Sequence, residues 1–461
     1  MSLMPAASAK DFSSILGGAD YGEAYLEQSS SDSIQLEDSR IEDIASSSER
    51  GMGLRYLRHR GPAVETLQGS AQALDADTAA KLRLNLFGKN DRAPVNMGEA
   101  KIYRHPIRID PASIPLDEKI ARLRKIDRIV REEFPHIRQV SLSYSQRRRD
   151  IEILNSEGAH CREERSFVLF SVTVVAEKDG MLQTGSEVLG GLKGYELLVD
   201  NDPELASRNA ARRALAKLKA PKAKAGEMPI VISSSAGGTF IHEAIGHSLE
   251  ADHVQEGSSP AYKGKIGKCV APETITVIDD PTLPFYRGGF KFDDDGIEAK
   301  PTAVVKNGVL TDYLYDRVTA MKEGKASNGH GRRQSFHCRP IPRMSNLYIA
   351  PGPDNPRSIL KSLKAGIFVT RMGGGQVNTA TGEFVFEVDE GYWVKDGIIR
   401  HMVRDANLLG VGPVILQSID RVGWDIGWGI GTCGKDGQGV PVGDGQPTLR
   451  IPKILIGGRH G

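Results

Sequence analysis

The first half of the chain alternates hydrophobic and polar residues over long stretches and then changes to helical spacing. From Tyr21 to about Gln68 the alternation is interrupted by turn residues, which predicts β-strands. Leu116–Phe134 instead places hydrophobic residues three or four positions apart, which predicts an amphipathic helix. The residues of its hydrophobic face are Ile120, Leu123, Ile126, Val130 and Phe134.

Further elements of the first half follow from the same patterns. Helices are predicted at residues 11–17, Asp75–Leu86 and Glu204–Leu218. An antiparallel meander is predicted from four strands, at Gln139–Gln146, Asp150–Asn155, His160–Glu177 and Gly180–Leu189. Gly88–Pro115 is punctuated by proline and glycine, so we expect an irregular connection there.

The second half consists mainly of short hydrophobic runs between glycines and turns, which is typical of a β-rich region with long loops. Its predicted elements are strands at Ile275–Asp279, Thr302–Lys306, Gly366–Arg371, Glu383–Val388 and Gly391–Val394, and a helix at Pro356–Leu363. Pro221–Gly226 is typical of a linker. With 461 residues, we therefore expect an α+β fold in two domains. Residues 1–220 are expected to form an α+β domain with an antiparallel sheet, and residues 227–461 a β-rich domain that carries the His242 helix.

The stretch Thr239–Glu250 holds the densest set of metal-binding side chains. Thr239 is expected to cap a helix whose hydrophobic side carries Ile241, Ile245 and Leu249. The opposite side carries His242, Glu243, Gly246, His247, Glu250 and His253. One face of this helix can pack while the other does chemistry, although an amphipathic helix that merely carries histidines fits the same pattern.

The spacing of His242 and His247 is unusual for a shared metal ion. Residues five apart are separated by about 140° on a regular helix, against about 40° for the common spacing of four. Both imidazoles could hardly reach one ion at bonds of about 2.0–2.1 Å from such a helix. A π-type bulge would bring them together, and Gly246 lowers its cost. We therefore predict a distorted turn around Ala244–His247.

Composition narrows the class of protein. The chain has 60 basic and 59 acidic residues, so nothing favours direct binding of nucleic acid or a membrane surface. The basic runs Arg147–Arg149 and Lys217–Lys224 are expected to be solvated faces or linkers. We expect no membrane-spanning segment and no secretory signal. The cysteines (Cys161, Cys269, Cys338 and Cys433) form no C-x-x-C pair, which favours the reducing cytoplasm over a disulfide framework.

Cys433 lies between glycines that could present its thiolate to a cleft. A catalytic zinc site takes about three protein ligands and keeps one open position, and a thiolate would complete a pair of imidazoles. Glu250 and His253 are rival third ligands, and a small buried hydrophobic residue is the common role of a lone cysteine. These alternatives stay open on the residues alone.

Four other motifs have weaker chemical interpretations. Gly429–Gly434 matches G-x-G-x-x-G, but Asp436 replaces the Ser/Thr of a phosphate loop and the following residues do not favour a helix. Asp293–Asp295 is expected to be a solvated acidic turn rather than a cation site. Arg332–Arg333 could bind a carboxylate or carbonyl, or face water. Gly373–Gly375 offers an edge where an extended peptide could lie, or a flexible loop.

Several long blocks resemble the TldD/PmbA family of metallopeptidases, also called candidate modulators of DNA gyrase. They are HEAIGHSLEAD (242–252), NGHGRRQSF (328–336), PRMSNLYIAPG (342–352), GGGQVNTATGEFVF (373–386) and GTCGKDGQGVPVGDGQPTL (431–449). Because the H-E-x-x-x-H motif is intact, the chain resembles the active TldD branch rather than the PmbA (TldE) branch. The resemblance covers the second half and agrees with the expected two-domain layout.

The resemblance implies a zinc peptidase with one ion per active subunit. His242, His247 and Cys433 would bind zinc, and Glu243 would be the general base. It also implies a dimer, either of identical chains or with a PmbA-type paralogue, with the N-terminal domain contributing to dimerisation and substrate access. The substrates would be extended or unfolded peptides, for which Gly373, Gly374 and Gly375 are candidate contacts. The alternatives are a peptide-binding regulatory subunit with a structural metal, and a nucleotide-dependent enzyme that depends only on Gly429–Lys435.

Overall fold

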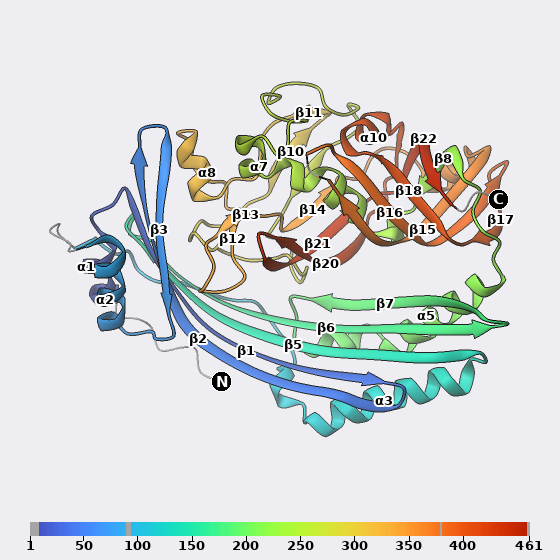
Figure 1. Cartoon of the computed structure of the whole chain (residues 1–461), viewed down its shortest axis with the longest axis horizontal. Coiled ribbons are helices and arrows are strands. Elements are labelled where there is room, and N and C mark those ends of the chain that lie inside the picture. The colour runs from blue at the N-terminus through green and yellow to red at the C-terminus, as the bar shows by residue number, and fades with distance from the viewer. Residues whose placement is uncertain (1–8, 89–93, 379, 459–461) are drawn as a thin grey trace.

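The N-terminal half is built on a long, curved sheet that is antiparallel apart from one parallel pair at its edge (Figure 1). This computed structural model describes residues 9–88, 94–378 and 380–458. The strand order is β3-β2-β1-β5-β6-β4, and β7 also pairs with β6. The strands are β1 Tyr21–Glu37, β2 Arg40–Arg60, β3 Ala63–Ala71, β4 Lys101–Arg104, β5 Ile137–Asn155, β6 His160–Lys178 and β7 Met181–Gly191.

Two long helices cover this sheet because each carries a hydrophobic face. Leu123, Ile126 and Val130 of α3 (Leu116–Glu133) are buried together with strand residues such as Val140 and Phe170. The helix α5 (Pro203–Lys219) contributes to the same cluster, and both predicted helices are confirmed. The shorter helices of this half are α1 Ala9–Leu16, α2 Ala76–Phe87, α4 Glu196–Asp200 and a 3-10 turn at Pro111–Ser113.

Two predictions for the meander need correction. The strands expected at Gln139–Gln146 and Asp150–Asn155 are one continuous strand, β5. The basic run Arg147–Arg149 lies inside β5 and is not simply solvated, because Arg149 is buried and donates to Glu27 Oε1 at 2.8 Å. Charge compensation from the neighbouring strand β1 keeps this arginine in the sheet, and local sequence does not reveal that partner. Gly88–Pro115 is largely irregular apart from β4 and the 3-10 turn, with residues 89–93 outside the described part.

The C-terminal half contains a sheet whose pairings close into a ring. β15 pairs with β8 and β16, β8 pairs with β22, and β18 joins β22 to β16. These strands are β8 Gly226–Ile232, β15 Ala365–Val377, β16 Glu383–Lys395, β18 Ala406–Val411 and β22 Leu449–Gly457, with β17 Ile398–Val403 and β19 Arg421–Val422 attached. The predicted strands Glu383–Val388 and Gly391–Val394 are both parts of β16.

A second C-terminal sheet has the order β11-β10-β9-β14-β21-β20. β20 stands at its end and pairs with β21 through a hairpin. The strands are β9 Val277–Asp279, β10 Thr302–Lys306, β11 Val309–Leu310, β14 Asn346–Ile349, β20 Gly427–Lys435 and β21 Gln438–Gln446. The remaining elements are α7 Ala251–Glu256, α8 Arg317–Lys322, α9 Pro356–Lys361, α10 Gly412–Ser418, a 3-10 turn at Ser234–Ala236, and the paired β12 Gly331–Arg332 and β13 Ile341–Pro342.

The segment that carries His242 lies in the core of the C-terminal half. Ile241, Ile245 and Leu249, the predicted hydrophobic side, are fully buried in a cluster that draws on both C-terminal sheets. The molecule is therefore mixed α+β and mostly sheet, as expected. The boundary of the two domains, residues 1–220 and 227–461, stays a prediction.

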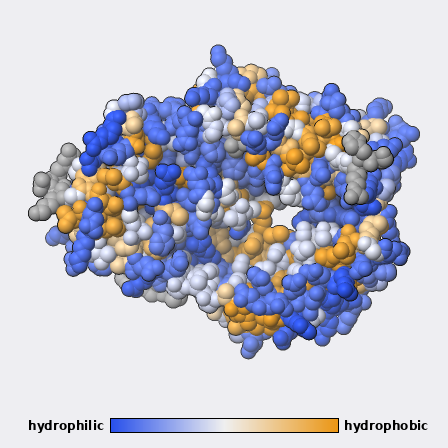
Figure 2. Space-filling model, viewed as in Figure 1, coloured by the Kyte–Doolittle hydropathy of each residue, from blue (hydrophilic) through white to orange (hydrophobic). Residues whose placement is uncertain are grey.

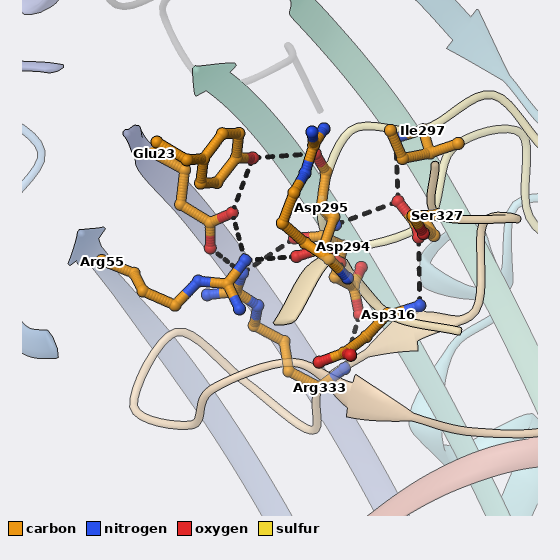
Figure 3. A network of polar contacts seen from close by, with 12 residues as sticks. Glu23, Arg55, Asp294, Asp295, Ile297, Asp316, Ser327 and Arg333 are labelled. Atoms are coloured by element: carbon orange, nitrogen blue, oxygen red, sulfur yellow. Dashed lines mark hydrogen bonds and ion pairs between the residues drawn. The ribbon is translucent and has the colours of Figure 1, made fainter. Parts of the chain in front are cut away.

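A buried ion network joins the two halves (Figure 3). Arg55 of β2 donates to Glu23 of β1 at 2.7 Å and also pairs with Asp295. Arg333 from the C-terminal half pairs with the other oxygen of Glu23. The prediction that Asp293–Asp295 is a solvated turn is wrong, because all three side chains are buried. Arg165 and Arg55, both distant in sequence, pair with Asp294 and Asp295, and backbone N–H groups donate to Asp293. The local pattern could not reveal these partners.

Glu23→Gln is expected to destabilise the fold strongly. It leaves Arg55 and Arg333 buried without the charge they share, which typically costs about 3–5 kcal/mol. Burial opposes ionisation of Glu23, but Arg55 and Arg333 outweigh it and lower the pKa of this carboxyl. Its contribution is therefore full above the ordinary glutamate pKa of about 4.3 and is lost as the pH falls through the lowered folded-state pKa.

Urea unfolding at neutral and acidic pH tests this prediction. Glu65→Gln is the matched control, because Glu65 pairs with Arg60 at 3.2 Å on an exposed strand surface, where a pair contributes only about 0–1 kcal/mol. We expect the Glu23→Gln midpoint to fall well below that of the control at pH 7, with the gap narrowing in acid. Equal midpoints for the two variants would contradict a stabilising role for the network.

Candidate metal centre

The His242 segment is a helix interrupted by a π turn. A short α-turn, Thr239–Ile241, leads into a π-helix at His242–Gly246 and then a 3-10 turn at His247–Leu249. The N–H of His247 donates to the carbonyl of His242, five residues earlier, so the turn contains one extra residue. The distorted turn predicted around Ala244–His247 is this π-helix. The two imidazole rings consequently meet, with centroids 5.0 Å apart.

Two local details differ from expectation. Thr239 is not the cap: Gly238 precedes the first turn, and no side chain caps it. Gly238 is fixed instead by backbone bonds, since its N–H donates to Asp444 and its carbonyl accepts from His242. Gly246 is required by packing as well as by the π turn, because a Cβ there would lie 2.0 Å from Met344 Sδ. Tertiary contacts, rather than a capping hydroxyl, set the start of this helix.

Cys433 comes to the two histidines from the far end of the chain. It lies on β20, and its Sγ is 3.5 Å from His247 Nε2. One ligand atom from each of His242, His247 and Cys433 lies within 4.8 Å of the other two. All three side chains are buried. The structure thus brings the three predicted ligands together, while Gly429–Lys435 forms strand β20 and not the loop and helix that a phosphate site requires.

Carboxylates orient both imidazoles. Asp444 Oδ1 lies 2.7 Å from His242 Nδ1, and Glu250 Oε2 lies 3.1 Å from His247 Nδ1. Such a carboxylate–histidine contact fixes the ring and leaves Nε2 for a metal. Sequence reasoning missed Asp444, although the Asp436–Gly437 dipeptide is a hairpin signal that folds residue 444 back toward the His242 segment.

The rival ligands Glu250 and His253 are engaged elsewhere. Glu250 accepts from the Lys435 ammonium at 3.1 Å as well as contacting His247, and Nδ1 of His253 lies 3.0 Å from the carbonyl oxygen of His247. Asp252 also accepts from Lys435, at 2.7 Å. The carboxylates of Glu250 and Asp252 are therefore compensated by the Lys435 ammonium. Neither Glu250 nor His253 belongs to the cluster of donor atoms around Cys433.

The electrostatics favour a thiolate at Cys433. Burial opposes its ionisation, but the hydrogen bonds and charges of His242 and His247 outweigh burial and lower the pKa of the thiol to about 5. Burial likewise disfavours a charged His247, but Glu250 and Cys433 raise its pKa to about 9. The deprotonated thiol is the form that binds metals.

Glu243 lies beside the donor cluster but is not part of it. Its side chain is half-buried, and its carboxylate lies 3.9 Å from His247 Nε2. Burial raises the pKa of the Glu243 carboxyl.

The spacing of the donor atoms fits a tetrahedral zinc ion. Bonds of about 2.3 Å to sulfur and about 2.0–2.1 Å to nitrogen place two tetrahedral ligands roughly 3.5 Å apart. The distance from Cys433 Sγ to His247 Nε2 is 3.5 Å. Two nitrogens and a sulfur also form a donor set that zinc accepts readily. The residues present therefore fit the metal.

A cavity of about 700 Å³ lies between the N-terminal sheet and the C-terminal half. Its walls come from β7, β15, β20 and the turn that leads into the His242 segment, and Figure 2 shows the molecule hollowed between the two halves. Gly373 and Gly374 line the cavity as candidate substrate contacts. Gly375 is not among its lining residues, and its missing Cβ makes room for the Phe386 ring.

The cavity wall also carries residues that sequence reasoning missed, among them Arg287, Tyr286 and Trp428. The Arg287 guanidinium donates to the Gly431 carbonyl and, at 3.1 Å, to the Thr432 hydroxyl. Burial lowers the pKa of Arg287 to about 10. The sequence left the environment of Arg332 and Arg333 open. Both side chains are buried outside this cavity, and Arg332 donates to the carbonyl of Pro441 at 2.7 Å. No local pattern distinguishes Arg287 from a surface arginine.

Family models of the PmbA/TldA metallopeptidases match most of the chain. The model of domain 1 matches residues 22–77, the central domain matches residues 109–218, and the C-terminal domain matches residues 225–458. The first two regions supply strands to the same N-terminal sheet, while the third contains the His242 segment and Cys433.

Curated relatives are similar over nearly the full chain. The "Metalloprotease TldD homolog" of Haemophilus influenzae is 34% identical over 456 residues, which cover 96% of this chain and 93% of that protein. The "Zinc metalloprotease TldD homolog" of Saccharolobus solfataricus is 30% identical over 343 residues, covering 74% and 76%.

Solved structures share the fold. A candidate modulator of DNA gyrase from Thermotoga maritima superimposes with a TM-score of 0.78 at 20% identity, covering 95% of this chain and 96% of that one. TldE from Thermococcus kodakarensis gives a TM-score of 0.72 at 16% identity, covering 95% of this chain and 97% of that one.

None of the helices in the described part of the chain is long and apolar enough to cross a membrane.

Proposed function

The chain belongs to the PmbA/TldD metallopeptidase family, and on that premise we propose that it is a zinc-dependent peptidase acting on extended or unfolded peptides. The observation that carries this proposal is the convergence of His242, His247 and Cys433, whose ligand atoms lie within 4.8 Å of one another. These three side chains would hold one zinc ion per active subunit. When bound, zinc supplies Lewis acidity that lowers the pKa of water and polarises the scissile carbonyl.

Glu243 is the proposed general base. It follows His242 directly, and its carboxylate lies 3.9 Å from His247 Nε2, within reach of the donor cluster. Burial raises the pKa of this carboxyl, which makes the carboxylate a stronger base. Glu243 would accept the proton of the attacking water and then deliver it to the leaving amine. Asp444 and Glu250 would hold the imidazole rings in position throughout.

The cavity supports binding of an extended backbone. β15 pairs with β8 only at Ile367–Val369, so the described part of β15 beyond this point has no strand partner on that side. Gly373 and Gly374 lie in this stretch and line the cavity. A peptide could add there as a strand, which reads backbone rather than side chains. The substrates proposed on this basis are peptides able to adopt a fully extended conformation.

The remaining expectations are also proposals. Partnership as a homodimer, or as a heterodimer with a PmbA-type paralogue, is proposed from the family. A cytoplasmic location is proposed from the scattered cysteines. The alternative of a regulatory subunit with a structural metal is less well supported. Structural zinc sites normally have four protein ligands, whereas the group around Cys433 contains three within the described residues. Direct contact with nucleic acid is not proposed, because basic and acidic residues balance.

Removal and return of the metal test this function. The purified protein is expected to contain about one zinc per chain and to hydrolyse an unstructured fluorogenic peptide. Chelation should remove both zinc and hydrolysis, and zinc should restore both where magnesium does not. Full hydrolysis by protein shown to be free of metal would overturn the proposal, and tight peptide binding without cleavage by zinc-loaded protein would favour the regulatory alternative.

A further inference from the structure

The cavity between β7, β15 and β20 has an unbalanced charge. Three cationic side chains line it, those of Lys193, Arg287 and Arg371. No aspartate or glutamate is found among its described lining residues. Elsewhere this chain pairs most of its buried cations with carboxylates, as for Arg55 and Arg149. A cavity with only positive charges attracts an anionic group from outside.

Only one of the three cationic side chains is already paired with carboxylates of the described residues. Arg371 pairs with Glu187 at 2.9 Å and with Asp389 at 3.3 Å, so its charge is compensated. Arg287 and Lys193 form no ion pair with the described residues, and Lys193 instead lies 5.3 Å from the centre of the Phe285 ring. Two positive charges are therefore available to a ligand.

Arg287 is held in place without a carboxylate. One of its terminal nitrogens, Nη1, donates to the Gly431 carbonyl and the Thr432 hydroxyl, directly before Cys433 on β20. These neutral acceptors fix the guanidinium but leave its charge uncompensated. Its remaining N–H groups have the fork geometry that suits a carboxylate. The residue consequently offers a site for a carboxylate that is oriented by Gly431 and Thr432, the two residues directly before Cys433.

Aromatic rings form the adjacent wall. The centroids of the Tyr286 and Trp428 rings lie 4.3 Å apart, and the exposed Phe285 ring also lines the cavity. Phe285 adopts a φ of 70°, a left-handed conformation that is rare for a bulky side chain. Its backbone is fixed by a bond from the Leu192 N–H to the Phe285 carbonyl, which ties this wall to the end of β7. Strained residues of this kind cluster at binding sites.

We propose that Arg287, assisted by Lys193, binds a carboxylate of the substrate peptide and so selects acidic peptides in this cavity. The inference rests on the proposed peptidase function and names its preferred substrate class. The aromatic wall would contact the apolar part of the residue that carries the carboxylate. The carboxylate can come from an aspartate or glutamate side chain or from the C-terminus of the peptide.

Four versions of one unstructured fluorogenic peptide test this proposal. The parent contains a single glutamate and a free C-terminus; the others carry glutamine in its place, a C-terminal amide, or both changes. For the wild-type protein, removal of the recognised carboxylate is expected to lower kcat/KM about 10- to 100-fold. Loss with glutamine alone identifies a side-chain carboxylate, and loss with the amide alone identifies the C-terminus. Equal kcat/KM for all four peptides would overturn the proposal.

Variants locate the carboxylate site. Arg287→Gln should lower kcat/KM for the parent peptide by a similar factor and remove the preference for a carboxylate, whereas Arg287→Lys should keep part of it. Arg357→Gln, on the exposed surface of α9, is the matched control and should retain the full preference. Zinc content is measured in parallel. If Arg287→Gln loses zinc, the proposal is tested instead by kcat/KM of Arg287→Lys and of the wild-type protein on the four peptides. A full preference retained by zinc-loaded Arg287→Gln would contradict the assignment to Arg287.

A binding measurement separates this inference from the proposed function. Fluorescence anisotropy with the Glu243→Gln variant follows binding of the same peptides without hydrolysis. Carboxylate-dependent binding together with no hydrolysis by the wild type would remove the peptidase function but support the carboxylate site. Hydrolysis of all four peptides at equal efficiency, with equal binding, would leave the peptidase function standing and remove the carboxylate site.

Discussion

Glu243→Gln is expected to lower the rate of peptide hydrolysis by about 10²- to 10⁴-fold, the usual contribution of a positioned general base. Glutamine keeps the shape of the side chain but cannot accept the proton. The Glu243 carboxylate is half-buried and 3.9 Å from His247 Nε2, so the change removes one charge without opening the core. Zinc content should stay at the wild-type level, because Glu243 is not one of the three proposed ligands. The measurements are kcat on an unstructured peptide and zinc per chain.

Glu256→Gln provides the matched control for this experiment. Glu256 lies at the exposed end of α7, on the next helix after the donor cluster. The same substitution there should leave kcat unchanged. If zinc-loaded Glu243→Gln hydrolysed peptide as fast as Glu256→Gln, the proposed role of Glu243 would be wrong.

Cys433→Ala is expected to reduce zinc from about one per chain to a small fraction and to abolish hydrolysis. A site with two imidazoles lacks the third protein donor that catalytic zinc sites have. The fold should remain, because the substitution removes one small side chain from a strand whose hairpin bonds are all backbone bonds. Zinc analysis after dialysis, with circular dichroism to verify folding, measures the effect.

Cys161→Ala is a suitable control for Cys433→Ala. Both cysteines are free and buried, but their environments shift the pKa of the thiol in opposite directions. Burial raises the pKa of Cys161 to about 12, whereas the two histidines lower that of Cys433 to about 5. Cys161→Ala should therefore keep its zinc. Normal zinc in Cys433→Ala, or equal loss in both variants, would contradict a role of this sulfur as ligand.

The sequence predicted the local structure of the His242 segment well, because spacing and backbone chemistry were specific there. Five-residue spacing of His242 and His247 with Gly246 between them required a π turn, and that turn is present. The helical face of α3 was equally clear, because hydrophobic periodicity reports burial directly. The approach of Cys433 was not derivable from spacing, since nearly two hundred residues separate it from His247. Its inclusion depended on resemblance to a family.

Long-range charge pairing explains the main errors. Asp294, Asp295 and Arg149 lie in segments with a solvated composition, yet charged partners from other strands allow their burial. Thr239 has the chemistry of a cap, but Gly238 and the backbone of β21 determine the start of that helix. The cationic wall of the cavity was equally hidden, because Arg287 and Lys193 become significant only when no carboxylate folds next to them.

X-ray absorption at the zinc edge tests the central claim most directly, because it counts the atoms bonded to the metal. For the purified protein we predict one sulfur at about 2.3 Å and two imidazole nitrogens at about 2.0–2.1 Å. The sulfur contribution should disappear from any zinc that remains in Cys433→Ala. A zinc shell without sulfur, or one filled by four protein donors, would contradict the account of a catalytic site built from His242, His247 and Cys433.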